Sequence, residues 1–364
     1  MLNLSYPPAL ETWWMNRAAA RTGKPAGPGV VRTIEPLVAA LSNTFTVARA
    51  DATAAYASDA KAWLAYGLYF FPQTFMRVRF VLEELRLRGF PIPPAPRVLD
   101  LGAGSGAATA ALLDAWGLPG ETTLLDRSPV GLDVARDLLV DVYRHAPRTT
   151  RGDLRELPDG QWDVLLVSYA LNESLATAPE AEQTKWIAAA ARRLTPNGLL
   201  LLCEPLIDSA GPFMDRLRTA ALGEAGLHIW APCPHAQACP LAARRSSCHD
   251  VRNWRMPPAA QALNNRLGRN IQDLKFSFLA LSPLAPPAAG PAFRLVAPVH
   301  PTKGKWEMVG CAPEGELRRY EVLKRDADEA ARRQLGDLER GDRVQLDDLT
   351  RAGDAWRGRL SGHA

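Results

Sequence analysis

Hydrophobic residues recur at helical spacing along the first 90 positions of the chain. In "DATAAYASDAKAWLAYGLYFFPQTFMRVRFVLEELRLRG" the Ala, Leu, Phe and Val residues follow this period, with Pro72 expected to break the helix and Gly89 to end it. The next segment, "FPIPPAP", predicts a stiff linker. We therefore expect residues 1–94 to form an N-terminal helical region and linker, whose simplest role is that of a packing layer.

Short apolar runs then alternate with helical patterns. "RVLDL", "TTLLD", "WDVLLVSYAL" and "LLLLCEP" predict buried strands, and "SPVGLDVARDLLVDVYRHA" predicts a helix with Ser128 as N-cap and Pro129 at its first position. Strands that alternate with helices indicate an α/β fold, in which a parallel sheet is covered on both faces. We assign this core to residues 95–228.

Strand-like runs return near the C-terminus without long helices between them. "KFSFLALSPL", "FRLVAPV", "KWEMVGCAP" and "ELRRYEVLKR" predict antiparallel strands that complete the sheet, over residues 257–326. Residues 327–364 are dense in charge, and we expect a solvated helix and a frayed end there.

Composition narrows the class of protein. The 364 residues are 47% hydrophobic and 23% charged, with a net charge of +4, which permits a nucleic-acid partner without requiring one. Five cysteines in so long a chain suit a reducing compartment better than a disulfide scaffold. No apolar run approaches the roughly 20 residues of a membrane-spanning helix, so we expect no membrane partner. The N-terminus lacks an apolar signal core, which favours the cytoplasm, with a mitochondrial transit peptide as the alternative.

A glycine-rich turn is the first candidate site. "LDLGAGSGAA" places Gly102, Gly104 and Gly106 directly between a strand and a helix, where glycines let a ligand approach the backbone and the helix N-terminus offers unpaired N–H groups. Asp126 ends the next strand, where a carboxylate can bind ribose hydroxyls. The same spacing also satisfies the dinucleotide fingerprint. Asp100 favours S-adenosylmethionine over NAD, because a carboxylate at that position would face a cationic group.

"LDLGAGSG" and the elements after it resemble motif I of the class I S-adenosylmethionine-dependent methyltransferases. The resemblance implies a Rossmann-like sheet and cofactor contacts from Asp100, the three glycines and Asp126. Asp153, in "RGDLRELP", matches the position at which that family contacts the adenine, although a Gly-Asp turn explains it equally well.

The target site of such an enzyme would follow the fourth strand, in "SYALNES". Tyr169, Asn172 and Glu173 are the candidate catalytic residues there. A strand-to-helix turn with Asn172 as its cap accounts for the same residues, so the sequence indicates cofactor binding more firmly than catalysis.

Three cysteines gather in "IWAPCPHAQACPLAARRSSCHD", which begins at Ile229 and which we assign to a metal-binding insertion over residues 229–256. The gaps between Cys233, Cys239 and Cys248 are wider than those of a zinc knuckle, and the prolines would hold the ligands apart. Cys311 is the natural fourth ligand.

Other ligand sets and metals stay open. His235 and His249 could replace Cys311, whereas Cys203 lies in an apolar run and is most simply a buried core thiol. Four thiolates select zinc or an iron–sulfur cluster, and the wide spacing slightly favours a 4Fe–4S cluster over zinc.

The cysteine pattern is similar to that of the methyltransferase-like small-ribosomal-subunit assembly factors of mitochondria and bacteria. The shared residues are "APCPHAQACPL" and "CHD", then "KFSFLAL" and the lone cysteine of "VGC", and the similarity covers most of residues 50–340. It implies binding of small-subunit rRNA during ribosome assembly, S-adenosylmethionine as cofactor, and a 4Fe–4S cluster on Cys233, Cys239, Cys248 and Cys311. Asp250 and "EPLIDSAG" depart from the family's pattern, and the second departure lies near the target pocket.

Arginines cluster around and after the cysteine segment and could form an RNA-facing surface: Arg244, Arg245, Arg252, Arg255, Arg266 and Arg269. We expect a monomer that binds the rRNA or its precursor particle. Two other functions fit part of the sequence: a small-molecule methyltransferase with structural zinc, and a nicotinamide-dependent oxidoreductase.

Overall fold

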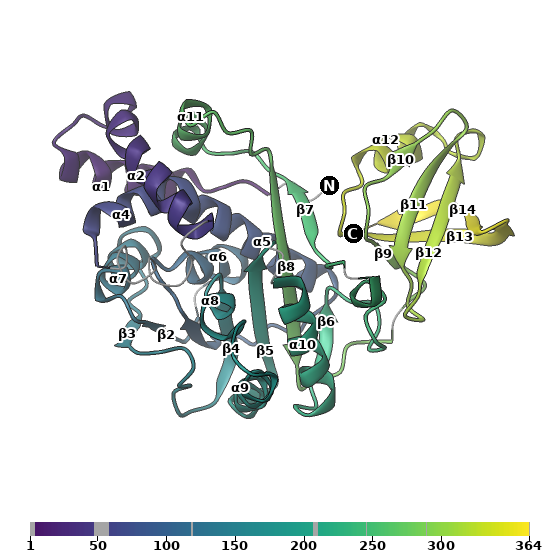
Figure 1. The fold of residues 1–364 in the computed structure, drawn as a ribbon, viewed down its shortest axis with the longest axis horizontal. Coiled ribbons are helices and arrows are strands. Elements are labelled where there is room, and N and C mark those ends of the chain that lie inside the picture. The colour runs from purple at the N-terminus through teal and green to yellow at the C-terminus, as the bar shows by residue number, and fades with distance from the viewer. Residues whose placement is uncertain are drawn as a thin grey trace.

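An eight-stranded mixed sheet forms the core of the protein (Figure 1). The computed structural model describes residues 4–46, 58–117, 119–206, 210–244, 246–288 and 290–363. The strands are β1 (Arg97–Leu101), β2 (Glu121–Asp126), β3 (Arg148–Arg151), β4 (Trp162–Ser168), β5 (Leu194–Pro205), β6 (His228–Ala231), β7 (Asp250–Asn253) and β8 (Asp273–Ser282). Their order is β3-β2-β1-β4-β5-β8-β6, and β7 also pairs with β8.

The direction of the strands changes once across this sheet. Strands β1 to β5 are parallel to one another, whereas β8 runs antiparallel to β5 and pairs with both β6 and β7. This arrangement confirms the predicted class I methyltransferase sheet, including its antiparallel addition.

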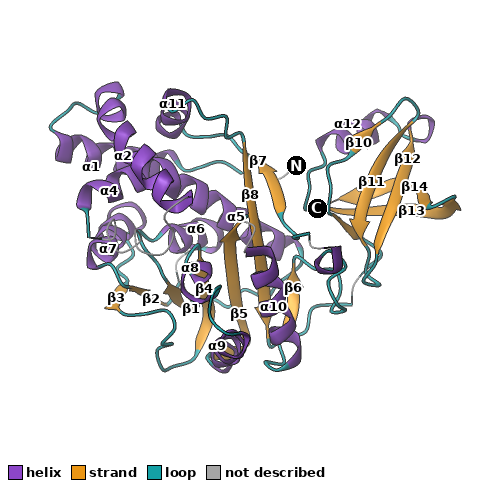
Figure 2. Ribbon diagram, viewed as in Figure 1, coloured by secondary structure: helices purple, strands orange, loops and turns teal. Residues whose placement is uncertain are grey.

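Helices cover both faces of the sheet (Figure 2). Alternate residues of β4 point to opposite faces: Val164 packs with α6 (Ala107–Trp116) and α7 (Pro129–Tyr143), and Leu165 packs with α9 (Glu180–Arg192) and α10 (Ala210–Gly223). Ser128 caps α7 as predicted, because its hydroxyl accepts a hydrogen bond from the Gly131 N–H.

The N-terminal helices form an additional layer on α6 and α7, except for α5 (Phe71–Leu87), which lies beside α6 and contacts β8 and β6. The helices are α1 (Pro8–Thr22), α2 (Pro28–Thr46), α4 (Ala60–Ala65), the π-helical turn η1 (Tyr66–Phe70) and α5, with α11 (Pro258–Arg266) packed beside them. Pro72 does not break the helix as expected, because it lies in the first turn of α5, where its missing N–H costs little. Gly89 does follow the end of α5 in the left-handed conformation. Within the described residues, no helix has the length and apolarity needed to cross a membrane.

The C-terminal strands form a second sheet instead of completing the first. Strands β9 (Phe293–Leu295), β11 (Lys305–Cys311), β12 (Leu317–Leu323), β14 (Ala355–His363) and β13 (Arg343–Ala352) pair in that order, and β13 pairs back to β9. Since β9 also pairs with β11, the five strands close into a barrel, with β10 (His300–Pro301) added to β11. The prediction that the strands of residues 257–326 complete the first sheet is confirmed for β8. It is wrong for β9 to β12, which belong to the second sheet.

For residues 327–364 the expected solvated helix is confirmed, whereas the expected frayed end is wrong. Residues 327–364 contain α12 (Glu329–Asp337) and the strands β13 and β14 of the barrel. Val344, Leu346 and Leu335 are buried in the barrel core, whereas charged residues before and after them, such as Arg333 and Asp347, are exposed. The alternating pattern of a half-buried strand was concealed by this density of charge.

A buried ion-pair network joins the barrel to the core. Arg294 of β9 is 2% exposed and donates hydrogen bonds to Glu84 of α5 at 2.7 Å and to Asp250 of β7 at 2.6 Å. Arg252 of β7 pairs with Asp250 and with Asp342, at the foot of β13. These five residues, the buried ion-pair network, connect four segments that are far apart in the sequence: α5, β7, β9 and the residue before β13.

Replacing Arg294 by Met should destabilise the protein strongly. The change leaves two buried carboxylates without their shared partner, which costs about 3–5 kcal/mol in the free energy of unfolding. Arg333→Met is the matched control, because Arg333 forms an exposed ion pair with Glu329, of a kind worth about 0–1 kcal/mol. Urea unfolding would measure both variants. Equal effects of the two substitutions would contradict the role given to the network.

Candidate functional site

The carboxyl ends of β1, β2 and β4 border a cavity of about 630 Å³. Ligands of parallel α/β sheets bind at this edge, where the loops that follow neighbouring strands meet. The lining comprises the glycine turn, the end of β2 and the turn after β4, together with side chains from α4, η1 and α5.

The glycine turn requires its glycines. Gly102, Gly104 and Gly106 have φ values of 70°, 50° and 79°, in the left-handed region that other residues rarely adopt. A Cβ atom on Gly102 would also lie 2.3 Å from the Cβ of Ala170. The Gly102 N–H donates to the Leu125 carbonyl at 2.8 Å, which holds the turn against β2. The backbone of Gly102 and Gly104 therefore borders the cavity directly.

Asp100 places an incompletely paired carboxylate beside this turn. Its side chain is fully buried, and Oδ2 accepts hydrogen bonds from the Thr109 hydroxyl at 2.7 Å and the Thr109 N–H at 3.3 Å. Oδ1 is buried and has no hydrogen-bond partner. Burial raises the pKa of Asp100 to about 7, because the charged form is poorly solvated there. A cationic ligand group in the cavity would supply the missing partner.

Asp126 and Asp153 differ in their relation to the cavity. Asp126 lines it, and accepts hydrogen bonds from the Gly104 N–H at 2.8 Å and the Ser128 N–H at 2.7 Å, while burial raises its pKa. Asp153 does not line it. Partial burial opposes ionisation of Asp153, but hydrogen bonds from Arg155 and Arg127 outweigh burial and hold its pKa well below the usual range.

The candidate catalytic residues after β4 are only partly brought together. Tyr169 and Glu173 line the cavity, whereas Asn172 does not. Tyr169 has a φ of 60°, its ring lies 5.0 Å from the Arg77 guanidinium carbon, and burial raises the pKa of its hydroxyl. That hydroxyl stays neutral at physiological pH, so it can position a substrate but is a poor base.

Glu204, which follows Cys203 on β5, lies close behind these residues. It accepts a hydrogen bond from the Leu171 N–H at 3.0 Å and is fully buried, which raises its pKa to about 8. The carboxyl group is therefore largely protonated at pH 7 and supports the turn after β4.

Sequence reasoning missed the roof of the cavity. Trp63, Tyr66 and Thr74 come from α4, η1 and α5 and line it opposite the glycine turn. The indole of Trp63 lies 3.3 Å from the position of a Cβ on Gly104. From the sequence, the simplest role of these helices is packing alone. The π-helical turn that presents Tyr66 is a feature often found at functional sites.

The structure gathers the predicted cysteines and leaves the fifth apart. Cys239 and Cys248 pack with Cys311 at the end of β11, around Leu241 and Val296. Cys233 accepts a hydrogen bond from Arg218 Nε at 3.3 Å, and His235 Nε2 lies 3.1 Å from the sulfur of Cys311. Cys203 is buried in the sheet. All five thiols are free.

The pKa shifts of the thiols indicate that the four cysteines lie close to one another. Burial raises the pKa of Cys311 to about 12, and negative charge on Cys233 and Cys239 adds to the effect. Burial and charge on Cys233 likewise raise the pKa of Cys248. Among the residues that the structure describes, no three Cys, His, Asp or Glu side chains are arranged to hold a single metal ion.

The six predicted RNA-facing arginines do not form one surface. Arg252 is 5% exposed and belongs to the buried ion-pair network, so the prediction is wrong for it. Arg244 and Arg255 are exposed. Arg266 and Arg269 contact α2 and η1, and Arg245 lies outside the described residues.

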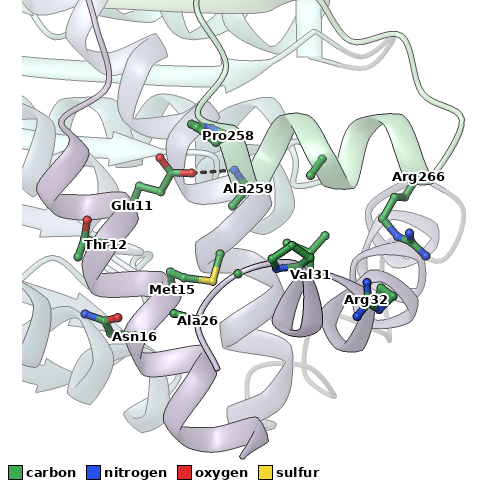
Figure 3. A pocket seen from close by; sticks show the side chains of 13 residues that line it. Glu11, Thr12, Met15, Asn16, Ala26, Val31, Arg32, Pro258, Ala259 and Arg266 are labelled. Atoms are coloured by element: carbon green, nitrogen blue, oxygen red, sulfur yellow. Dashed lines mark hydrogen bonds between the residues drawn. The ribbon is translucent and has the colours of Figure 1, made fainter. Parts of the chain in front are cut away.

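A second cavity, of about 610 Å³, lies between α1, α2 and α11 (Figure 3). Met15 and Val31 give it apolar walls, and the Glu11 carboxylate accepts a hydrogen bond from the Ala259 N–H at 2.7 Å. None of its lining residues lines the cavity at the glycine turn. It holds none of the residues predicted to bind a cofactor or a metal.

Comparisons with known proteins find curated relatives that match about half of this chain. The Rsm22-cox11 tandem protein 2, mitochondrial, of Schizosaccharomyces pombe is 25% identical over 190 residues, covering 49% of this chain and 25% of that protein. The glycine/sarcosine/dimethylglycine N-methyltransferase of Actinopolyspora halophila is 30% identical over 172 residues, covering 44% of this chain and 29% of that protein. This chain thus matches less than a third of the length of either relative.

Among solved structures, the mitomycin 7-O-methyltransferase MmcR is similar, with a TM-score of 0.37 and 24% identity over 63% of this chain and 70% of that one. The family model for the mitochondrial small ribosomal subunit protein Rsm22 matches residues 60–356, from the roof of the cavity to the last strand of the barrel. The chain therefore belongs to the Rsm22 family.

Proposed function

We propose that the cavity at the glycine turn binds S-adenosylmethionine. The observation that carries the proposal is the buried Oδ1 of Asp100, which lacks a hydrogen-bond partner beside a turn that exposes backbone. The amino group and sulfonium of S-adenosylmethionine are cationic and would meet that carboxylate. Asp126 keeps lone pairs free for ribose hydroxyls, because each of its oxygens accepts one hydrogen bond in the structure.

Methyl transfer is a second step of the proposal. Bound in this cavity, S-adenosylmethionine would supply an electrophilic methyl group. Trp63 and Tyr66 would cover the ligand, and Tyr169 and Glu173 would border the acceptor. The neutral Tyr169 hydroxyl would orient the acceptor by hydrogen bonding.

We propose that the macromolecular partner is the small ribosomal subunit, through its rRNA. Support comes from the Rsm22 family match and from the exposed arginines Arg244 and Arg255. Phosphate contacts from arginines supply much of the affinity of RNA-binding proteins. The names of the S. pombe relatives and of the family fit the mitochondrial alternative for localisation, and a cytoplasmic location stays a prediction.

For the cysteines we propose a 4Fe–4S cluster. The support is the proximity of the thiols: Cys239 and Cys248 pack with Cys311, and charge on Cys233 and Cys239 acts on Cys311. A cluster spreads its ligands over a larger body than one zinc ion does. Arg218 and Arg294 lie close enough to offset thiolate charge on Cys233 and Cys248. The cluster would hold the insertion to the barrel.

Gly104→Val should abolish binding of S-adenosylmethionine, since the added side chain would enter the space between the backbone and Trp63. Gly226→Val is the matched control: Gly226 also has a positive φ, of 63°, but open space around its Cβ position. Isothermal titration calorimetry would measure both variants. A wild-type chain that binds NAD and ignores S-adenosylmethionine would refute the proposed ligand.

The affinity for S-adenosylmethionine should fall as the pH decreases below about 7. The free site has an Asp100 pKa of about 7, and a cation binds the ionised form, so below that pH binding must first remove a proton. The loss approaches tenfold per pH unit. Asp100→Asn should bind weakly at pH 7.5 and show a flat profile between pH 7.5 and 5.5. An unchanged pH dependence in the variant would exclude Asp100 as the cation's partner.

Replacing Cys233, Cys239, Cys248 or Cys311 by Ser should remove iron and brown colour from anaerobically purified protein. Cys203→Ser is the control, because that thiol lies in the sheet, and it should keep both. Loss of RNA binding should accompany loss of the iron if the cluster orders the insertion. One zinc and no iron per chain would contradict the cluster while keeping a metal in the insertion.

A further inference from the structure

The barrel has the topology of an OB-fold. Its five strands pair in the order first, second, third, fifth, fourth and back to the first, namely β9, β11, β12, β14 and β13. The third and fifth strands, β12 and β14, are parallel, and α12 lies between the third and the fourth. OB-folds bind oligonucleotides and oligosaccharides on the second and third strands and on the loops that join strands one to two and four to five.

In this barrel the same region is hollowed. A cavity of about 340 Å³ is lined by Pro298 from the first of these loops, by Met308 and Arg319 from β11 and β12, and by Asp354 from the second loop. A neighbouring cavity of about 640 Å³ shares Arg319 and Asp354 and extends to Trp356. Together they form a continuous groove, the barrel groove, across β11, β12 and the start of β14.

The barrel groove contains an aromatic side chain, Trp356, that makes cation–π contacts with two arginines. Trp356 is half-buried, and the guanidinium carbons of Arg351 and Arg318 lie 4.7 Å and 5.7 Å from its ring centroid. Arg351 is exposed and forms no ion pair with any residue that the structure describes. An aromatic ring flanked by arginines offers stacking to a nucleobase and charge to its phosphates.

The charge of the groove favours an anion. Arg244, Arg318, Arg319 and Arg351 line the larger cavity, against the carboxylates Glu316 and Asp354. Glu316 pairs with the half-buried Arg318 and Asp354 with the exposed Arg319, and ion pairs that are open to solvent contribute little to stability. Phosphates can therefore replace them at small cost.

The groove is continuous with the cysteine insertion. Arg244 comes from that insertion, just after Cys239, and lines the groove together with barrel residues. Close packing fixes the same junction, since a Cβ on Gly315 of the β11–β12 turn would lie 2.9 Å from the Cβ of Gln237. Order in the insertion therefore determines where one of the groove's cations lies.

We propose that the barrel groove binds single-stranded RNA, with one base stacked on Trp356 and the adjoining phosphates held by Arg244, Arg319 and Arg351. This proposal depends on the proposed function only for the identity of the RNA, which is then a single-stranded segment of small-subunit rRNA. Binding is separate from the cavity at the glycine turn, because the two sites share no lining residue.

The test uses the full chain and a fluorescein-labelled ten-nucleotide single-stranded RNA, measured by fluorescence anisotropy over a salt series. Trp356→Ala should weaken binding about tenfold or more, the effect of losing one stacked base, and Trp356→Phe should restore most of it. Arg351→Ala should lower the slope of log affinity against log salt by about 0.7. Arg333→Ala, on α12 outside the groove, is the control and should change neither.

Urea unfolding of each variant shows whether the barrel stays folded, and the exposed Arg351 gives a test that does not depend on Trp356. Unchanged affinity in both Trp356→Ala and Arg351→Ala, in a chain that still binds a small-subunit rRNA fragment, overturns the groove and leaves the proposed function standing. A ten-residue polyglutamate peptide that competes as strongly as the RNA also overturns it, because the groove would then read charge alone. Binding of the oligonucleotide without affinity for any rRNA fragment supports the groove and counts against the proposed partner.

Discussion

Arg294 forms ion pairs with both Glu84 and Asp250, and the arrangement of the molecule depends on this interaction. One guanidinium, almost completely buried, ties the first strand of the barrel to α5 and to β7. Desolvation opposes the charge on Glu84, but Arg294 and Arg88 outweigh it and lower the pKa of Glu84 to about 2, so the pair stays ionised at neutral pH. Removing one of these charged groups would leave the others unpaired in a low-dielectric interior. The ion pairs therefore hold the three distant segments α5, β7 and β9 in fixed relative positions.

Those positions bring the cysteines together. Asp250 follows Cys248 and His249 directly, so holding Asp250 also holds the end of the cysteine insertion. Arg294 begins the barrel that carries Cys311 on β11, and β9 pairs with that strand at Cys311 itself. The ion-pair network and the four thiols are therefore two adjacent parts of one junction, at which an insertion with little regular structure of its own becomes ordered.

The sequence predicted well what local rules determine. The glycine turn, Asp100 and Asp126 follow from φ requirements and strand ends, and the Ser128 cap follows from one side chain and its own helix. The barrel could not be predicted in the same way, because its closure depends on pairing β9 with β13 and β12 with β14 across dozens of residues. Its apolar positions, such as Val344 and Leu346, alternate with charges that suggested a solvated tail. The prediction that Arg252 faces RNA is wrong for a related reason, since only the fold shows that Asp342 lies beside it.

The central claim is that this member of the Rsm22 family combines a methyltransferase-type ligand cavity with an RNA-binding barrel directed at the small ribosomal subunit. Ultraviolet cross-linking of the tagged full chain in its native cells, with sequencing of the attached RNA, tests it most directly. The account predicts small-subunit rRNA as the enriched species, with cross-links concentrated in single-stranded segments and attached to peptides from β12, β13 and β14. RNA recovered at the level of an unrelated protein of equal charge, or drawn evenly from all cellular RNA, would contradict it.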